Sequence, residues 1–176
     1  PPALLSDADV ATFFQILSAH IVPKAELHFS TPLDLLIAVV LSAQCTDKAV
    51  NRVTTTLWQH CRTATDYLDW GQERLEVSCR SIGLFRAKAK AIVGICQQLL
   101  AHHGGDVPRS REELMALPGV GRKTANVVLN VAFGEPVLAV DTHIFRVANR
   151  MGLAPGKDVR AVEDALLRRI PKGYLV

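Results

Sequence analysis

The sequence lacks any apolar run close to the length that crosses a bilayer. Its longest run, Leu35–Leu41, is followed at once by Ser42 and Gln44, whereas a spanning helix needs about 20 apolar residues. The start, Pro1–Asp9, has neither the basic region nor the apolar stretch of a secretory signal. These absences predict a soluble, cytoplasmic protein.

Cysteines are few and far apart. The chain has four, with no Cys-x-x-Cys pair, and each falls within a helical, partly apolar pattern. We therefore expect isolated buried thiols and no metal site built from them: Cys45, Cys61, Cys79 and Cys96.

A large net charge is also missing, since the formal charge is only +3. The distribution is uneven, because residues 1–47 carry a net −4 and residues 48–176 a net +7. A nucleic-acid partner is compatible with this balance if it meets the later part of the chain. With 49% hydrophobic and 21% charged residues in 176, the composition excludes disorder and fits ordinary globular structure.

Helical signals cover most of the chain. Ser6 with Asp9 and Ser110 with Glu113 have the spacing of a capping box, and Thr31 before Pro32 forms a cap followed by an N1 proline. Only residues 137–140 favour a strand, and four residues without a partner do not make a sheet. We predict an all-α protein of nine or ten helices, which begin near Ser6, Thr31, Asp47, Thr65, Arg86, Ser110, Arg122, Asp141 and Asp158. Asp47 is expected to cap the third of these helices.

A glycine-containing turn, Leu117–Ala125, joins two predicted helices. Gly119 and Gly121 permit positive φ and leave backbone N–H groups unshielded, so that these groups can converge on a phosphate at the start of the next helix. Val120 is expected to point inward, and the next turn is basic. A bare Gly-x-Gly between helices is more often an ordinary turn, but the proline, the central valine and the basic turn favour phosphate binding. The segment resembles the helix-hairpin-helix motif of sequence-nonspecific DNA-binding proteins.

Lys123 lies in the first turn after these glycines, where the positive end of the helix dipole disfavours an ammonium group. A lysine that gives up its proton readily can act as a nucleophilic amine. A solvated surface charge would explain a lysine here equally well if the hairpin stood alone.

Four segments together resemble the endonuclease III family, in order and at the family's spacing from about Ala25 to Ile170. They are Leu41-Ser42-Ala43-Gln44-Cys45-Thr46-Asp47, Ser81-Ile82-Gly83-Leu84-Phe85-Arg86-Ala87-Lys88-Ala89, Leu117-Pro118-Gly119-Val120-Gly121-Arg122-Lys123-Thr124-Ala125-Asn126-Val127-Val128 and Val140-Asp141-Thr142-His143-Ile144-Phe145-Arg146-Val147.

The resemblance implies a helix-hairpin-helix DNA glycosylase fold. Residues 25–136 would form a six-helix barrel, and residues 1–24 with 137–176 a second all-α lobe. The implied function is base excision repair by a DNA glycosylase and AP lyase that removes oxidised pyrimidines from duplex DNA. The enzyme is expected to act on the chromosome as a monomer.

The same resemblance implies the site residues. Lys123 would form a Schiff base with the sugar, and Asp141 would stabilise positive charge or assist proton transfer, although capping a helix explains Asp141 equally well. Gln44 and Leu84 would enter the duplex. The remaining expected DNA contacts are Gly119, Val120, Gly121, Arg122, Thr124, His143, Lys88 and Arg146, of which the charged ones could also be ordinary surface residues.

The sequence departs from the family after Cys96, because the four cysteines that hold a 4Fe-4S cluster in the family are absent. We expect a missing C-terminal segment rather than a lost cluster, and partly uncovered apolar residues at Val159, Val162 and Leu166. A monovalent cation at the backbone oxygens of Met115, Leu117 and Val120 is a further implication. The alternatives are a noncatalytic helix-hairpin-helix DNA-binding module and a related mismatch or adenine glycosylase, which Lys123 disfavours.

Overall fold

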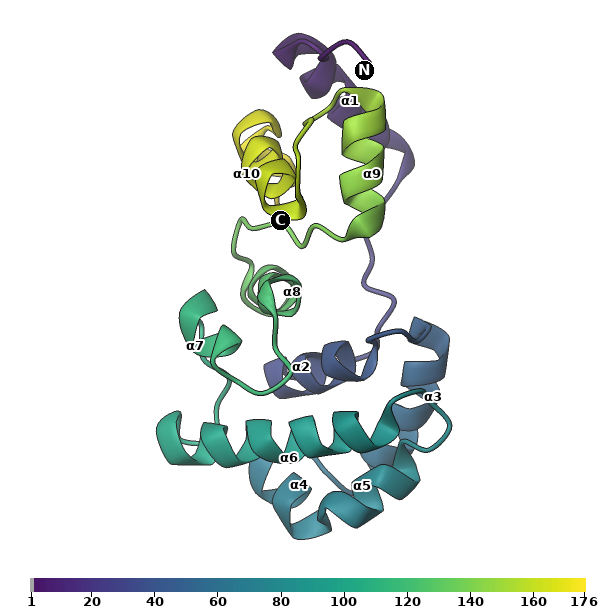
Figure 1. Ribbon diagram of the computed structural model, residues 1–176, viewed down its shortest axis with the longest axis vertical. Coiled ribbons are helices and arrows are strands. Elements are labelled where there is room, and N and C mark those ends of the chain that lie inside the picture. The colour runs from purple at the N-terminus through teal and green to yellow at the C-terminus, as the bar shows by residue number, and fades with distance from the viewer. Residues whose placement is uncertain (1) are drawn as a thin grey trace. The chain divides into compact units, whose positions relative to one another are not determined.

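Residues 2–176 are described by a computed structural model, and within this range they form helices and loops without a β-strand. The all-α prediction is confirmed (Figure 1). The helices are α1 (Asp7–His20), α2 (Pro32–Leu41), α3 (Asp47–Leu57), α4 (Ala64–Trp70), α5 (Gln72–Ser78), α6 (Phe85–His102), α7 (Arg111–Met115), α8 (Arg122–Phe133), α9 (Thr142–Met151), α10 (Val159–Arg169) and a 3₁₀ turn η1 (Lys172–Tyr174). No helix in the described range is both long and apolar enough to span a bilayer.

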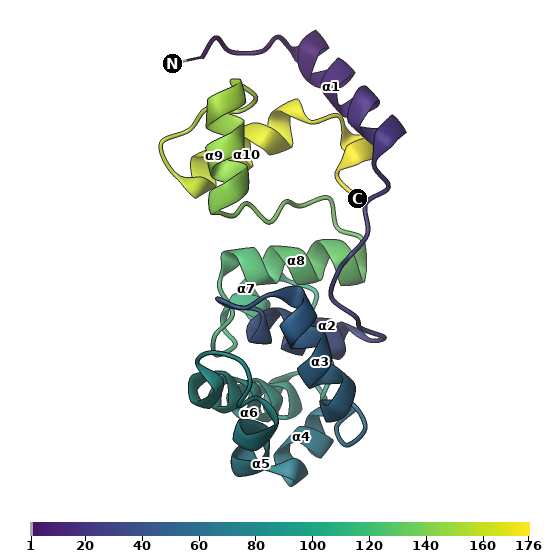
Figure 2. The same cartoon turned by 90° about the vertical axis from the view of Figure 1, so that its right-hand side faces the viewer.

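The chain divides into two units. The central unit is Ala25–Phe133 and holds α2 to α8, whereas the terminal unit combines the residues up to Lys24 with Gly134–Val176 and holds α1, α9, α10 and η1. Figure 2 shows which helices belong to each. That the helices of the central unit form a six-helix barrel stays a prediction.

Helix α2 forms the middle of the central core. Its residues from Leu33 to Leu41 are all buried, and it packs against α3, α6 and α8. The buried Asp34 is tolerated because its Oδ2 accepts hydrogen bonds from the backbone of Ser30 and Thr31 and lies 2.9 Å from Nη2 of Arg62. The predicted Thr31–Pro32 helix start is thereby confirmed.

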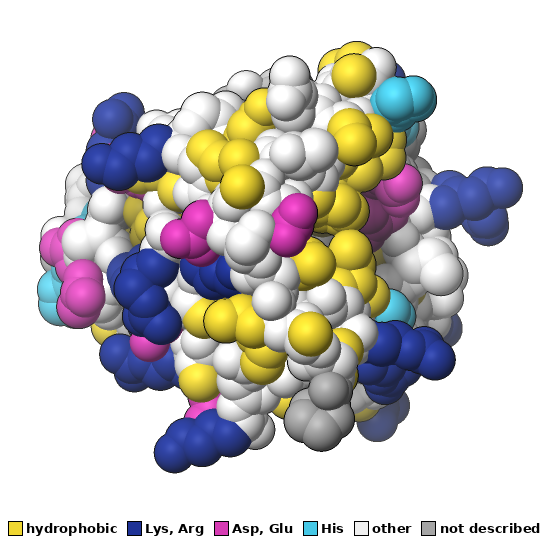
Figure 3. Space-filling model, turned by 90° about the horizontal axis from the view of Figure 1, so that it is seen from above, with side chains coloured by type: hydrophobic (Ala, Val, Ile, Leu, Met, Phe, Trp, Pro, Cys, Tyr) yellow, Lys and Arg dark blue, Asp and Glu magenta, His cyan; other side chains and the backbone are white. Residues whose placement is uncertain are grey.

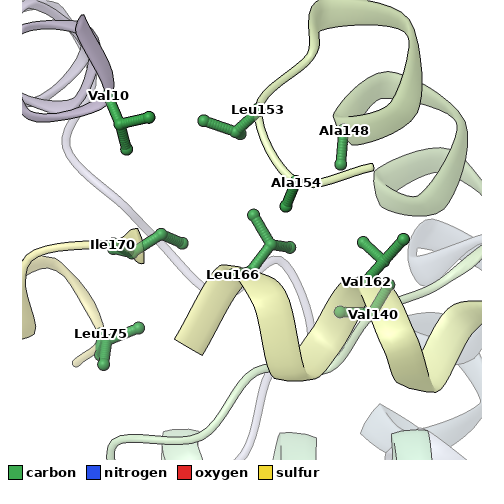
Figure 4. Packing of buried hydrophobic residues seen from close by; sticks show 9 residues of the cluster. All are labelled: Val10, Val140, Ala148, Leu153, Ala154, Val162, Leu166, Ile170 and Leu175. Atoms are coloured by element: carbon green, nitrogen blue, oxygen red, sulfur yellow. The ribbon is translucent and has the colours of Figure 1, made fainter. Parts of the chain in front are cut away.

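The terminal unit has its own core, shown in Figure 4. Val10 of α1 packs in one cluster with residues of α9, α10 and the loops around them. Arg169 of α10 also donates hydrogen bonds to the carbonyl oxygens of Leu153 and Leu5. The first and last helices are therefore joined through both apolar and polar contacts.

Several apolar side chains of the terminal unit stay at the surface, and the view in Figure 3 shows such side chains gathered on one face. Ile16 of α1 is 57% exposed and Val147 of α9 is 50% exposed. Of the three residues expected to be uncovered, only Val159 is exposed, at 39%. The expectation was wrong for Val162 and Leu166, which are buried because they pack in the cluster with Val10.

Two local predictions need correction. The N-cap of α3 is Thr46, whose hydroxyl accepts a hydrogen bond from the Ala49 N–H at 3.3 Å, so Asp47 is the first helical residue and not the cap. Cys61, Cys79 and Cys96 are buried free thiols as predicted, but Cys45 is half-buried.

Candidate active site and nucleic-acid interface

The hairpin between α7 and α8 is built from glycines with different roles. Gly119 has φ +72°, and a Cβ there would lie 3.2 Å from the Cβ of Ala91. Gly121 does not have the positive φ that we expected both glycines to supply. A Cβ there would meet nothing within 4 Å. Gly119 is thus required by the turn itself, whereas Gly121 leaves the backbone open to an approaching ligand.

The hairpin is also packed firmly on α6. Val120 is buried at 6% exposure, as predicted. Pro118 lies against Gly94, where an added Cβ would come within 2.9 Å of the Pro118 ring. The start of α8 is therefore held by a rigid turn, with exposed Gly121 and Lys123 and partly exposed Arg122 and Thr124 at the surface. Backbone N–H groups and cations together at a helix start form an arrangement that binds phosphate.

Lys123 lines a pocket of about 240 Å³ within the central unit. The polar residues that share this pocket are Glu26, Ser42 and Asp47, and most of the others are aliphatic. The aliphatic residues suit the body of a small ring, and Lys123 supplies an amine at the same pocket. The other lining residues are Ala25, Leu27, Leu35, Val39, Val127 and Val131.

Gln44 and Leu84 share an unusual backbone conformation. Their φ angles are +55° and +59°, and no other non-glycine residue in the described range has a positive φ. Both side chains are exposed, Leu84 at 56%. Left-handed backbone is costly for residues with a Cβ and occurs often at functional sites.

Lys88 is buried, so its side chain is not placed to contact a phosphate. Its side chain is 5% exposed, and its Nζ is buried without a hydrogen-bond partner. The burial of Lys88 could have been predicted from the sequence, because Lys88 is in helical register with the buried Ile92, Ile95 and Leu99 of α6. Arg86 and Lys90 lie on a different side of the helix and are exposed.

Asp141, His143 and Arg146 belong to the terminal unit. Asp141 is the N-cap of α9, and its Oδ1 accepts hydrogen bonds from the N–H groups of His143 at 2.9 Å and Ile144 at 2.8 Å. The capping role considered for Asp141 is therefore observed. The His143 ring is largely exposed, with Nδ1 3.7 Å from Asp141 Oδ2, and Arg146 is exposed.

The cysteines do not fit an iron–sulfur cluster. The described residues contain no group of three or more His, Cys, Asp or Glu side chains that could hold a metal. Burial also raises the pKa of the Cys61 thiol to about 11 and that of Cys96 to about 12, which disfavours the thiolates that such a cluster needs. No chemical step is assigned to a cluster in these 176 residues.

Comparison with known proteins decides the family. Residues 37–172 match the model of the HhH-GPD superfamily base excision DNA repair proteins. Endonuclease III of Haemophilus influenzae is 53% identical over 154 residues, which are 88% of this chain and 73% of that protein. Endonuclease III of Bacillus subtilis is 53% identical over 150 residues, 85% of this chain and 68% of that protein.

The chain belongs to the endonuclease III family. It is accordingly a base excision DNA repair enzyme of the glycosylase and AP lyase class.

Solved structures of this family agree with that membership. A non-covalent endonuclease III–DNA complex has 47% sequence identity and a TM-score of 0.90, and it matches 96% of this chain and 80% of that chain. A trapped endonuclease III–DNA covalent intermediate has 48% identity and a TM-score of 0.88, with the same coverage. A thermostable thymine-DNA glycosylase, at 23% identity and a TM-score of 0.72, shares the fold.

Proposed function

We propose that this enzyme excises oxidised pyrimidines from duplex DNA and then incises the strand through a lysine Schiff base. The observation that carries the proposal is Lys123, which is exposed in the first turn after the phosphate-binding hairpin and lines a pocket with carboxylates and aliphatic residues. Related enzymes that only excise a base would not need an amine at this position.

The reaction begins with extrusion of the damaged nucleotide from the base stack. Leu84 enters the duplex as an apolar wedge, and the Gln44 amide hydrogen-bonds the base left without its partner. Their exposed side chains on left-handed backbone support this role, because a conformation of this cost is found mostly where a functional site needs it.

Lys123 then attacks C1′ of the sugar. The new N–C1′ bond replaces the glycosidic bond, the base leaves and takes up a proton, and opening of the sugar gives a Schiff base. Loss of a C2′ proton expels the 3′ phosphate by β-elimination. Asp141 stabilises the positive charge that develops on the sugar or assists proton transfer, while its Oδ1 caps α9.

The partner is duplex DNA that contains a damaged base or an abasic site. We assign phosphate contacts to Gly119, Val120 and Gly121 of the hairpin. We assign further DNA contacts to residues close in sequence to Lys123 or Asp141, namely Arg122, Thr124, His143 and Arg146. Lys88 is left out because it is buried. We further propose a monomer that acts on the chromosome in the cytoplasm, a monovalent cation at the hairpin carbonyls, and a 4Fe-4S cluster only for a longer form of the protein.

Borohydride trapping tests the proposal. Borohydride reduces a Schiff base to a stable amine, so the wild-type protein incubated with a thymine-glycol duplex should give a covalent protein–DNA band. Lys123→Gln should give none while still binding the DNA. Lys157→Gln, at an exposed lysine of the terminal unit, is the matched control and should trap like the wild type. Unimpaired DNA binding without any wild-type adduct would instead indicate a noncatalytic DNA-binding module.

A further inference from the structure

Glu26 and Asp47 form a carboxylate wall of the pocket that Lys123 lines. The same two residues also line a second hollow, which His28, Lys48 and Arg52 share. The two acids therefore border both this hollow and the pocket that Lys123 lines. The two acids reach this position in different ways, since Asp47 lies in α3 and Glu26 lies in a bend of the loop before α2.

Asn51 of α3 fixes that loop. Its Nδ2 donates a hydrogen bond to the carbonyl oxygen of Glu26 at 2.9 Å, and its Oδ1 accepts one from the N–H of His28 at 2.9 Å. The side-chain amide of Asn51 is thus oriented with its NH₂ group toward the Glu26 carbonyl and its oxygen toward the His28 N–H. Asn51 follows Asp47 by one helical turn, so α3 carries one acid of the wall and holds the backbone of the other.

We propose that Glu26 is a specificity-determining residue that accepts hydrogen bonds from the extruded base, and that Asn51 is the positioning residue that keeps it at the pocket. This inference rests on the proposed function. A ring derived from thymine offers its N3–H as a donor, and oxidation of its C5–C6 double bond to a glycol adds hydroxyl donors at both carbons. An ionised carboxylate is an acceptor only, and hydrogen bonds to charged groups are the stronger ones. The aliphatic residues of the pocket, including Leu27 beside Glu26, suit the body of the ring.

The test separates base excision from strand cleavage. Excision is measured on a duplex with one thymine glycol, and lyase activity on the same duplex with a preformed abasic site, which needs Lys123 but no base recognition. Glu26→Gln should lower excision about tenfold or more, as expected for a lost charge-assisted hydrogen bond, and leave the lyase rate within about twofold. Glu73→Gln, at an exposed acid of α5 outside this pocket, should change neither rate.

Asn51→Ala should reproduce the selective loss of excision, with a folded circular dichroism spectrum. Combining it with Glu26→Gln should add little further loss, because both changes act on one interaction. Equal loss of both activities in Asn51→Ala would show a merely structural role for Asn51, and an unchanged ratio of excision to lyase rates in Glu26→Gln would overturn the proposal. If the wild-type protein acts on neither substrate, the proposed function itself has failed.

Discussion

Backbone strain in the central unit is concentrated at the two residues that we propose enter DNA. Gln44 and Leu84 adopt left-handed conformations that cost about 1–2 kcal/mol each for a residue with a Cβ. Neither side chain is buried in compensation, since Gln44 is exposed and Leu84 is 56% exposed. The protein therefore gives up stability at these points, as proteins do where a site needs a particular backbone conformation.

At position 84, the glycine variant should be more stable than the alanine variant, which is the reverse of the order expected inside a helix. Because φ is positive, Leu84→Gly should be more stable than Leu84→Ala by about 1 kcal/mol, while both variants lose the apolar wedge and excise the base more slowly. At Leu100, inside α6 and also partly exposed, the glycine variant should be the less stable one by about 1 kcal/mol. Urea unfolding of the four variants measures this, and the same order at both positions would contradict the strain.

These single-residue features were mostly beyond sequence reasoning. The wedge roles of Gln44 and Leu84 came from resemblance, and their positive φ had no local signal because neither is glycine or asparagine. Glu26 and Asn51 were missed because their hydrogen bonds join segments that the sequence separates by more than 20 residues. Lys88 is different: its register with the buried face of α6 could be seen in the sequence, but the resemblance placed it among the DNA contacts.

At the scale of elements, helix starts were the most predictable feature because capping is local. Ser6 and Asp9 form the expected capping box, and Asp141 and Asp158 cap the helices predicted to follow them. The start of α3 was misassigned by one residue because Thr46 and Asp47 are both good caps. Burial of whole helix faces was less predictable, since it depends on partners distant in sequence, as Val162 shows.

The hairpin makes two matched glycine substitutions informative. Gly121→Ala should leave the melting temperature unchanged or slightly higher, because its backbone conformation is ordinary and the Cβ meets open space. It should nevertheless weaken DNA binding, because the methyl group stands on the surface that phosphate approaches. Gly119→Ala should be destabilised by about 1–2 kcal/mol from its positive φ alone.

Thermal melting and fluorescence anisotropy with undamaged duplex, at several salt concentrations, separate the two effects. Wild-type affinity should fall as salt rises, because phosphate contacts displace counterions. Undiminished affinity of Gly121→Ala would argue against a phosphate at this turn.

At the scale of the whole molecule, buried thiols make stability depend on alkaline pH. Burial raises the pKa of Cys61 and Cys79 to about 11 and that of Cys96 to about 12, and the charge of Lys88 opposes the shift at Cys79. An unfolded thiol ionises near pH 9.0. These thiols therefore ionise at a lower pH in the unfolded chain than in the folded one. Their contribution to the free energy of unfolding is fully present below about pH 9 and is lost as the pH rises to about 11–12.

Urea unfolding at about pH 8 and about pH 10.5 checks this dependence. Cys79→Ala should reduce the loss of unfolding free energy between the two pH values by roughly 1–3 kcal/mol, whatever its effect at pH 8. Cys45→Ala, at a half-buried position, provides the comparison. An identical pH dependence in wild type and Cys79→Ala would refute the assignment.

The link between Arg169 and the carbonyl of Leu5 has a consequence for synthesis on the ribosome. The central unit is one continuous stretch, but most of the apolar residues that pack with Val10 of α1 come from beyond Gly134. At a synthesis rate of about 5–20 residues per second, α1 emerges on the order of ten seconds before α10. During that interval the central unit can fold, while the apolar face of α1 stays exposed to water until the later residues that cover it have been synthesised.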